Sequence, residues 1–221
     1  MKVMRKINVI SKMVVMIFLY LTGQVAFASE NTAASQRILI VYFSQPEEMT
    51  SDSVDGFSGA SVLQKNVPET GSTQYIAQLI QQQTQGSLFR IETTIPYPRQ
   101  HDALLQFAEK EQQTKARPSF KTPLPDLSNY DTVYVGYPIW WYTMPMVIYA
   151  LFEQNNFAGK TIIPFTTHGG SQLADSLREI ARRQPQAKLV TRALSISRND
   201  ISNPEIPDQV KQWVQQVNPQ H

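Results

Sequence analysis

The chain of 221 residues contains no cysteine. Without thiols it can form no disulfide, ligate no iron–sulfur cluster and use no thiol nucleophile, so these three kinds of chemistry are excluded. The sequence also lacks a basic stripe with interleaved aromatic residues, which is the usual mark of a nucleic-acid-binding surface. We therefore expect no nucleic-acid partner, and we predict no metal site.

A long hydrophobic run is missing as well. The most apolar stretch, residues 13–21, is too short to span a bilayer comfortably. It follows a head with four basic residues and no acidic one, and it precedes the small-x-small pattern of residues 26–28. This order is typical of a secretory signal peptide. We predict a signal peptide at residues 1–28, a single domain at residues 29–221 and no stable membrane span after cleavage. An uncleaved anchor is the alternative.

Two further absences bear on export. The first residues contain no twin-arginine pair, which favours the general secretory route, and without cysteine there is no lipoprotein anchor. We expect the protein in a periplasm, with secretion from the cell as the alternative. Removal of the leader leaves 16 basic and 18 acidic residues, a net charge of −2, so the mature protein has little electrostatic steering toward partners.

The mature chain alternates between two kinds of pattern. Apolar runs rich in β-branched residues predict strands buried on both faces, and amphipathic stretches between them predict helices. The strands are expected at residues 37–43, 88–92, 132–136, 161–166 and 189–195, and the helices at 73–83, 102–115, 145–153, 173–183 and 207–217. This alternation favours β-α-β crossovers and a doubly wound parallel sheet. A long loop insertion at residues 46–70 interrupts the rhythm, and such loops are usually functional or disordered.

A ligand of a doubly wound sheet lies outside the carboxyl ends of the strands. Three predicted loops leave the sheet there. The first joins Ser44 and Gln45 to the helix start at Ser72, Thr73 and Gln74. Small hydroxyl residues next to a glycine expose backbone N–H groups at a helix N-terminus, which favours phosphate binding. An ordinary helix cap is the alternative.

The other two loops suit a flat ring. The second consists of Pro138, Ile139, Trp140, Trp141 and Tyr142. Three aromatic rings in a row cannot all face a core, so we expect exposed aromatic surface that holds a planar cofactor. A partner-binding patch or a folded-back hydrophobic plug is the alternative.

The third loop consists of Thr167, His168, Gly169 and Gly170. Its paired glycines allow a ligand to approach the backbone closely, and consecutive N–H groups can bond ring carbonyl oxygens. A simple turn is the alternative.

Together these segments resemble a known family. The stretches at residues 38–44, 71–74, 135–141 and 164–171 are similar to those of the flavodoxin family, and most similar to its branch with a Tyr-Pro-x-Trp-Trp loop. The resemblance covers residues 37–217. It implies a flavodoxin-like three-layer α/β/α sandwich, a five-stranded parallel sheet of order 2-1-3-4-5, and FMN bound without a covalent link.

The resemblance also implies roles for the three loops. Ser44, Gln45, Ser72, Thr73 and Gln74 match the phosphate-binding segment. Residues 138–142 match the loop along one side of the isoalloxazine, with Trp140 the first choice to stack on it and Trp141 the second. Residues 167–170 match the loop at its other side. The long insertion departs from the short turn that the family usually has there, and it offers a lid or a docking surface.

Three functions remain open from the sequence. An electron-transfer flavodoxin would pass electrons between redox partner proteins. An FMN-dependent NAD(P)H:quinone-type oxidoreductase would reduce a small-molecule acceptor, and His168 could then protonate the flavin or a quinone oxygen. The near-neutral charge keeps this second function open, because carriers are commonly strongly acidic. An exported chain without flavin would instead act as a binding module.

Cleavage after Ala28 can be tested directly. We expect protein recovered from the envelope of expressing cells to begin at Ser29, because the small residues at 26 and 28 suit signal peptidase. N-terminal sequencing and intact mass measure this. Recovery of the full-length chain in the membrane fraction would favour the uncleaved anchor.

Overall fold

The computed structural model describes residues 37–47 and 70–218. The predicted signal peptide and most of the predicted insertion lie outside these ranges. The described strands are β1 (Ile38–Tyr42), β2 (Ser87–Arg90), β3 (Thr132–Pro138), β4 (Thr161–His168), β5 (Lys188–Leu189) and β6 (Leu194–Ser197). The described helices are α2 (Ser72–Thr84), α3 (His101–Thr114), α4 (Met146–Gln154), α5 (Ser176–Arg183) and α6 (Ile206–Val217), with a 3-10 turn at Leu127–Asn129.

All pairs of strands in the sheet are parallel, and their order is β2-β1-β3-β4-β5. The predicted strand order 2-1-3-4-5 is therefore confirmed. β1 and β3 are buried along their whole length, as the unbroken apolar runs at these positions predict. The central strands thus form the interior of the sheet.

The fifth strand differs from its prediction. Instead of one run over residues 189–195, two short strands, β5 and β6, pair with successive parts of β4. Between them the carbonyl of Arg192 accepts a hydrogen bond of 2.8 Å from the indole Nε1 of Trp213 in α6. Because that carbonyl is bonded to a helix side chain, the ladder is interrupted at this point.

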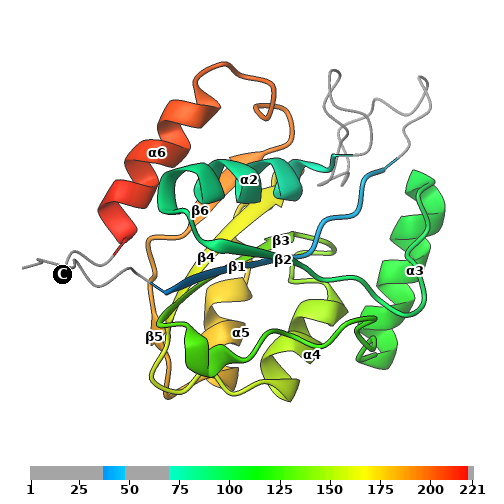
Figure 1. Cartoon of the computed structure of the whole chain (residues 1–221). Coiled ribbons are helices and arrows are strands. Elements are labelled where there is room, and N and C mark those ends of the chain that lie inside the picture. The colour runs from blue at the N-terminus through cyan, green and yellow to red at the C-terminus, as the bar shows by residue number, and fades with distance from the viewer. Residues whose placement is uncertain (1–36, 48–69, 219–221) are drawn as a thin grey trace, which may run out of the picture. The chain divides into compact units, whose positions relative to one another are not determined.

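Helices cover both faces of the sheet, as Figure 1 shows: α2 and α6 lie on one face, and α3, α4 and α5 lie on the other. Each face of the sheet has its own hydrophobic core, and alternate residues of β1 belong to one core or the other. Leu39 and Val41 pack on the side of α4, whereas Ile38 and Ile40 pack with α2 and α6. The predicted three-layer arrangement is confirmed. No helix within residues 37–47 and 70–218 is both long and apolar enough to cross a membrane.

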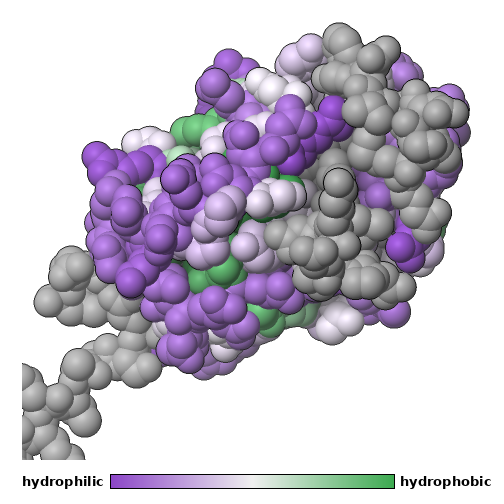
Figure 2. Space-filling model, turned by 90° about the horizontal axis from the view of Figure 1, so that it is seen from above, coloured by the Kyte–Doolittle hydropathy of each residue, from purple (hydrophilic) through white to green (hydrophobic). Residues whose placement is uncertain are grey.

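The helices turn polar faces outward. In Figure 2, which looks onto the side of α2 and α6, the described residues in view are mostly hydrophilic and apolar ones appear only in small separate areas. Ile76, Ala77 and Ile80 of α2 are fully buried under this polar surface. Their spacing of one, three and four residues forms the apolar stripe of an amphipathic helix.

Gly136 sits where the central strands leave no room for a side chain. It pairs with Tyr42 of β1 and Phe165 of β4. A Cβ atom added there would lie 2.1 Å from Cζ of the Phe165 ring, far inside van der Waals contact. The glycine therefore allows the large Phe165 ring to pack across β3.

We expect Gly136→Ala to lower the free energy of unfolding by about 1–3 kcal/mol, as overpacking of a core does. Urea denaturation measures the loss. A Phe165→Leu change opens space at the same point, so the double variant should lose less than the two single variants together. Strictly additive losses would show that the Phe165 ring is not the obstacle.

Candidate functional site

Three chain segments leave the sheet at the carboxyl ends of β1, β3 and β4. The register of the strands places these ends beside one another, since Tyr42 pairs with Gly136 and Pro138 pairs with Thr167. The pairing continues past the strands, because the N–H of Ile139 donates to the carbonyl of Thr167 at 2.8 Å. The three loops that the sequence singled out therefore meet at one edge.

The start of α2 lies against the end of β1. Gly71 precedes the helix in an extended conformation, and no side chain caps the helix there. A Cβ atom on Gly71 would lie 2.3 Å from Oγ of Ser44. The missing side chain at Gly71 therefore lets the Ser44 hydroxyl lie against the start of α2. Ser72 and Thr73, the first residues of α2, are fully buried.

Two polar atoms at this point are buried without a partner. Within the described residues, Oγ of Ser44 and Oε1 of Gln74 make no hydrogen bond. Ser44 itself is only 1% exposed. A buried polar atom without a partner costs about 1–3 kcal/mol, so such atoms are rare in a finished interior. The pair marks a place where a bound molecule can supply the missing partners.

The second loop contains a tight turn. Trp140 and Thr143 exchange two backbone hydrogen bonds of 3.0 Å, with Trp141 and Tyr142 between them. The φ angles of these two central residues are +48° and +61°. This is the geometry of a type I′ turn, in which Asn-Gly is preferred, so two aromatic residues in it store strain.

The turn is held against α3. Nε1 of Trp141 donates to the carbonyl of Leu105 at 3.0 Å, and Nε2 of Gln112 donates to the carbonyl of Trp141 at 3.4 Å. The ring of Trp141 stays 39% exposed and that of Tyr142 71% exposed. Both rings thus reach the surface beside the other two loops.

The third loop is tied to the first. Oγ1 of Thr167, at the end of β4, lies 2.7 Å from Oγ1 of Thr73 in the first turn of α2. Both residues are fully buried. Gly169 and Gly170 follow with no Cβ atoms, and Gly170 has a φ of +136°. The contact fixes the distance between the helix start and the glycine pair.

A comparison with known proteins agrees with this geometry. The model of a protein family described as Flavodoxin matches residues 62–217, more than half of the chain. The chain belongs to the flavodoxin family. No curated protein matches it.

Solved structures share the fold of this chain. A protein of Bacteroides eggerthii assigned as a flavoprotein is 24% identical, with a TM-score of 0.61 over 83% of this chain and 99% of that one. A similar protein of Bacteroides uniformis is 26% identical, with a TM-score of 0.60 over 82% and 99% of the two chains. A flavoprotein of Lactobacillus acidophilus in complex with FMN is 14% identical, with a TM-score of 0.50 over 80% and 98%.

The aromatic loop differs from its prediction in one respect. The three rings were expected to be exposed, with Trp140 the first choice to stack on a flavin, but Trp140 is 3% exposed and belongs to the core. Its ring packs edge-on against Phe43 and Tyr97, with centroids 5.5 and 5.4 Å away. Because the chain reverses immediately after Trp140, that ring stays beneath the turn while Trp141 and Tyr142 project from it.

Gln45 also has a use that its predicted phosphate role did not foresee. Its side-chain amide donates to the carbonyls of Tyr97 and Pro98, at 3.2 and 3.1 Å. The carbonyl of Ser44 accepts a bond of 3.3 Å from Arg90 of β2. The side chain of Gln45 therefore holds the connector after β2 against the first loop.

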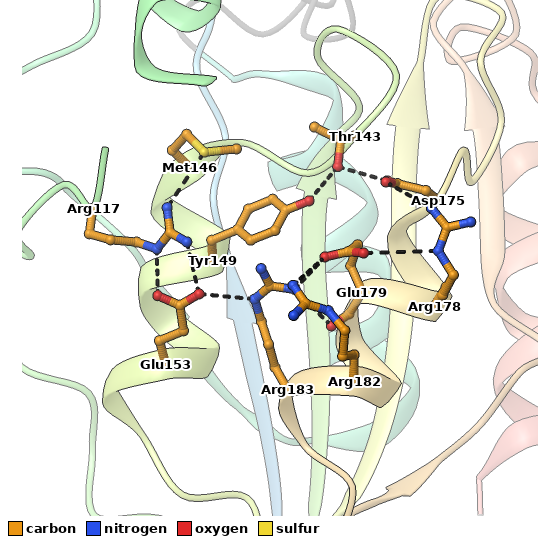
Figure 3. A network of polar contacts seen from close by, with 10 residues as sticks. All are labelled: Arg117, Thr143, Met146, Tyr149, Glu153, Asp175, Arg178, Glu179, Arg182 and Arg183. Carbon is orange, nitrogen blue, oxygen red and sulfur yellow. Dashed lines mark hydrogen bonds and ion pairs between the residues drawn. The ribbon is translucent and has the colours of Figure 1, made fainter. Parts of the chain in front are cut away.

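Sequence reasoning missed several residues around the edge of the sheet where the three loops meet, which we call the rim. Glu47 and His101 form a buried contact of 2.7 Å between Oε2 and Nδ1, which joins the first loop to α3. Thr143 contacts Tyr149 and Asp175 through its hydroxyl, within the polar network of Figure 3. Glu47 and Asp175 resemble ordinary loop acids in the sequence, and only the fold brings their partners to them. The described part of the chain holds no cluster of three or more His, Cys, Asp or Glu side chains suited to a metal ion.

A cavity of about 230 Å³ opens beside the first loop. Phe43, Ser44 and Gln45 form one wall, and the segment after β2 forms the other. Arg90 and Lys121 also line it, with Glu92 3.3 Å from the Lys121 amino group. The cavity is distinct from the aromatic turn but shares Ser44 with the start of α2.

His168 has a defined tautomer. Its Nδ1 accepts a hydrogen bond of 2.9 Å from the N–H of Gly170, so the ring hydrogen of the neutral form is on Nε2. Burial lowers the pKa of His168, and the charge of Asp200 opposes this only in part. The imidazole is therefore a neutral donor at neutral pH.

We expect the pKa of His168, followed by NMR titration, to lie below the ordinary value of about 6.5. The unfolded chain then binds the proton at a higher pH than the folded chain does. Stability is complete above the unfolded pKa and is lost as the pH falls toward the folded pKa. A His168→Asn variant should lose this part of the pH dependence. A titration at or above the ordinary value would contradict the burial argument.

Proposed function

We propose that this protein binds FMN without a covalent link and transfers electrons through it. The observation that carries the proposal is the buried, unpartnered hydroxyl of Ser44 against the backbone of Gly71 at an uncapped helix start. The flavodoxin family membership and the FMN complex of the Lactobacillus acidophilus protein support the same ligand.

The start of α2 suits a phosphate group. A helix N-terminus carries unsatisfied N–H groups and a partial positive charge, and a phosphate supplies acceptor oxygens to both. The hydroxyl of Ser44 would donate to a phosphate oxygen and so gain its missing partner. The unpartnered Oε1 of Gln74 would accept from a hydroxyl of the ribityl chain. Thr73 holds this region to the end of β4 and need not touch the ligand.

The flavin ring would lie at the aromatic turn. Trp141 and Tyr142 offer the exposed rings, and an offset stack contributes roughly 0.5–1.5 kcal/mol beyond burial. Trp140 is buried beneath the turn, so Trp141 and Tyr142 are the rings that we propose to stack on the flavin. On the other side, the backbone N–H of Gly169 and the neutral Nε2–H of His168 would offer uncharged donors to ring oxygen and nitrogen atoms, with the imidazole held by the N–H of Gly170.

When bound, FMN supplies the redox chemistry, whereas the protein binds the cofactor, orients it and sets its electronics. The uncharged donors at the rim give no cation to stabilise negative charge on the ring. We therefore propose a low-potential electron carrier that exchanges electrons with redox partner proteins. We also propose that it works outside the cytoplasm, on the strength of the leader at residues 1–28.

One observation favours a second function, an FMN-dependent oxidoreductase. The cavity beside Ser44 has room for a small acceptor such as a quinone, and Arg90 and Lys121 give it positive charge. Stopped-flow reduction with NADH and NADPH in the presence of quinones separates the two functions. A carrier shows no turnover, whereas an oxidoreductase turns over and loses activity when the cavity is filled.

The first experiment is the cofactor content of protein purified from the cell envelope. Visible absorption bands like those of FMN, released on denaturation, support the proposal. An apo protein that takes up neither FMN nor riboflavin in titrations would leave an exported binding module as the function.

Ser44→Ala should separate binding from stability. We expect FMN affinity to fall about tenfold, because one hydrogen bond to a charged phosphate is lost, while riboflavin affinity stays unchanged. The free energy of unfolding of the apo protein should stay equal or rise, since a buried hydroxyl without a partner is removed. Isothermal titration and urea denaturation measure the two quantities.

Thr84→Val is the matched control at the other end of α2. Its hydroxyl donates to the carbonyl of Ile80 and accepts from the N–H of Gly86. This variant should lose stability and keep FMN affinity. Equal FMN affinity in Ser44→Ala and the wild type would place the phosphate elsewhere.

A further inference from the structure

Thr143 stands between the two loops that would hold the flavin ring. It closes the aromatic turn, and its Oγ1 lies 2.7 Å from Oδ1 of Asp175, which lies five residues after Gly170 and directly before α5. The same Oγ1 lies 2.6 Å from the hydroxyl of Tyr149 in α4. Figure 3 shows the three side chains pointing toward one another from three different elements.

The direction of these bonds follows from their chemistry. A carboxylate accepts and cannot donate, so the single hydrogen of the Thr143 hydroxyl goes to Asp175. The hydroxyl of Tyr149 must then donate to Thr143. The hydrogen bonds therefore run in one direction: Tyr149 donates to Thr143, and Thr143 donates to Asp175.

Asp175 bonds Thr143 and does not cap its own helix. It is the residue before α5, where an Asp side chain ordinarily accepts from the first N–H groups of the helix. In this chain it makes no such capping bond. Its Oδ1 is turned to Thr143 and its Oδ2 lies 3.4 Å from Arg178. The carboxylate therefore contacts Thr143 and the Arg178 side chain of α5 instead of capping the backbone of that helix.

Tyr149 is fixed from below. The guanidinium carbons of Arg183 and Arg117 lie 4.1 and 5.3 Å from the centroid of its ring. Glu153 holds both guanidiniums, at 3.1 Å from Nε of Arg183 and 2.9 Å from Nη2 of Arg117. Arg117 lowers the pKa of Glu153, which keeps that carboxylate charged at neutral pH. These contacts hold the Tyr149 ring where its hydroxyl meets Thr143.

We propose that Thr143, Asp175 and Tyr149 form a loop clasp that sets the spacing of the aromatic turn and the glycine loop around the flavin ring. The inference rests on the proposed function and deepens it. The three residues are positioning residues, because they act through Trp141, Tyr142 and the third loop. The clasp also holds the strained φ angles of the turn, which two aromatic residues would otherwise leave.

The test compares two ligands in the full mature protein. Thr143→Val removes the hydroxyl and keeps the shape, and it should weaken FMN and riboflavin by the same factor of about ten. Ser44→Ala, by contrast, acts on FMN alone. Thr143→Ser restores the hydroxyl and should restore both affinities.

A second variant tests the direction of the hydrogen bonds from Tyr149 through Thr143 to Asp175. Tyr149→Phe keeps the ring over the guanidiniums and removes only the donor to Thr143. It should weaken both ligands by a smaller factor, and the double variant with Thr143→Val should be no weaker than Thr143→Val alone. Thr132→Val, the same change at the amino end of β3, is the control and should leave both affinities unchanged.

Hydrogen exchange in the apo protein gives a reading that needs no ligand. The amides of Trp140 and Thr143 are bonded across the turn and should exchange faster in Thr143→Val than in Thr132→Val. Wild-type affinities for both ligands, or wild-type exchange of these amides, would overturn the clasp. If the wild type binds neither ligand, the proposed function fails, and exchange alone decides on the clasp.

Discussion

Because β1, β3 and β4 run parallel and side by side, the chain must leave the sheet three times within a small area. Each exit brings unpaired backbone groups to the same edge, and each has to be satisfied by a turn, a helix start or a ligand. Within the sheet, Gly136 of β3 lets these strands pack closely, since it leaves room for the Phe165 ring to lie across β3. The register of the parallel strands therefore brings the three loops together, whatever side chains the loops carry.

The residues at this edge give up local stability in three separate ways. Ser44 keeps a buried hydroxyl without a partner, Trp141 and Tyr142 occupy backbone angles that favour glycine, and Asp175 leaves its own helix uncapped. Each feature is unfavourable on its own, and each lies in a segment that follows β1, β3 or β4. Concentrated local conflict of this kind is expected where binding, and not folding, selects the residues.

Much of the fold follows from the sequence because burial on both faces leaves a plain signal. The runs around β1 and β3 have no polar alternation, so these strands and the parallel sheet could be predicted from them, whereas the strand order came from the resemblance to the flavodoxin family. The fifth strand could not, because its interruption depends on a bond between Arg192 and Trp213 that lie 21 residues apart. Local patterns do not contain contacts of that range.

The loops of the candidate site could be predicted from the sequence, but the directions of their side chains could not. The glycine at the start of α2 and the glycines after β4 indicate close backbone approach whatever the fold. Trp140 was misjudged because one residue of alternation decides whether a ring points into a core, and the tight turn after it is not visible in the composition. Thr143 and Asp175 carry no pattern at all, since their meaning comes from being 32 residues apart and in contact.

The division of the last strand has a consequence for how copies of this protein meet one another. One margin of the sheet is β2, four residues long, and the other is made of β5 and β6, two and four residues long. Short margins offer few free hydrogen-bonding groups to a neighbouring chain, which limits strand addition and aggregation. The indole of Trp213, which donates to the Arg192 carbonyl, lies where this margin divides into two short strands.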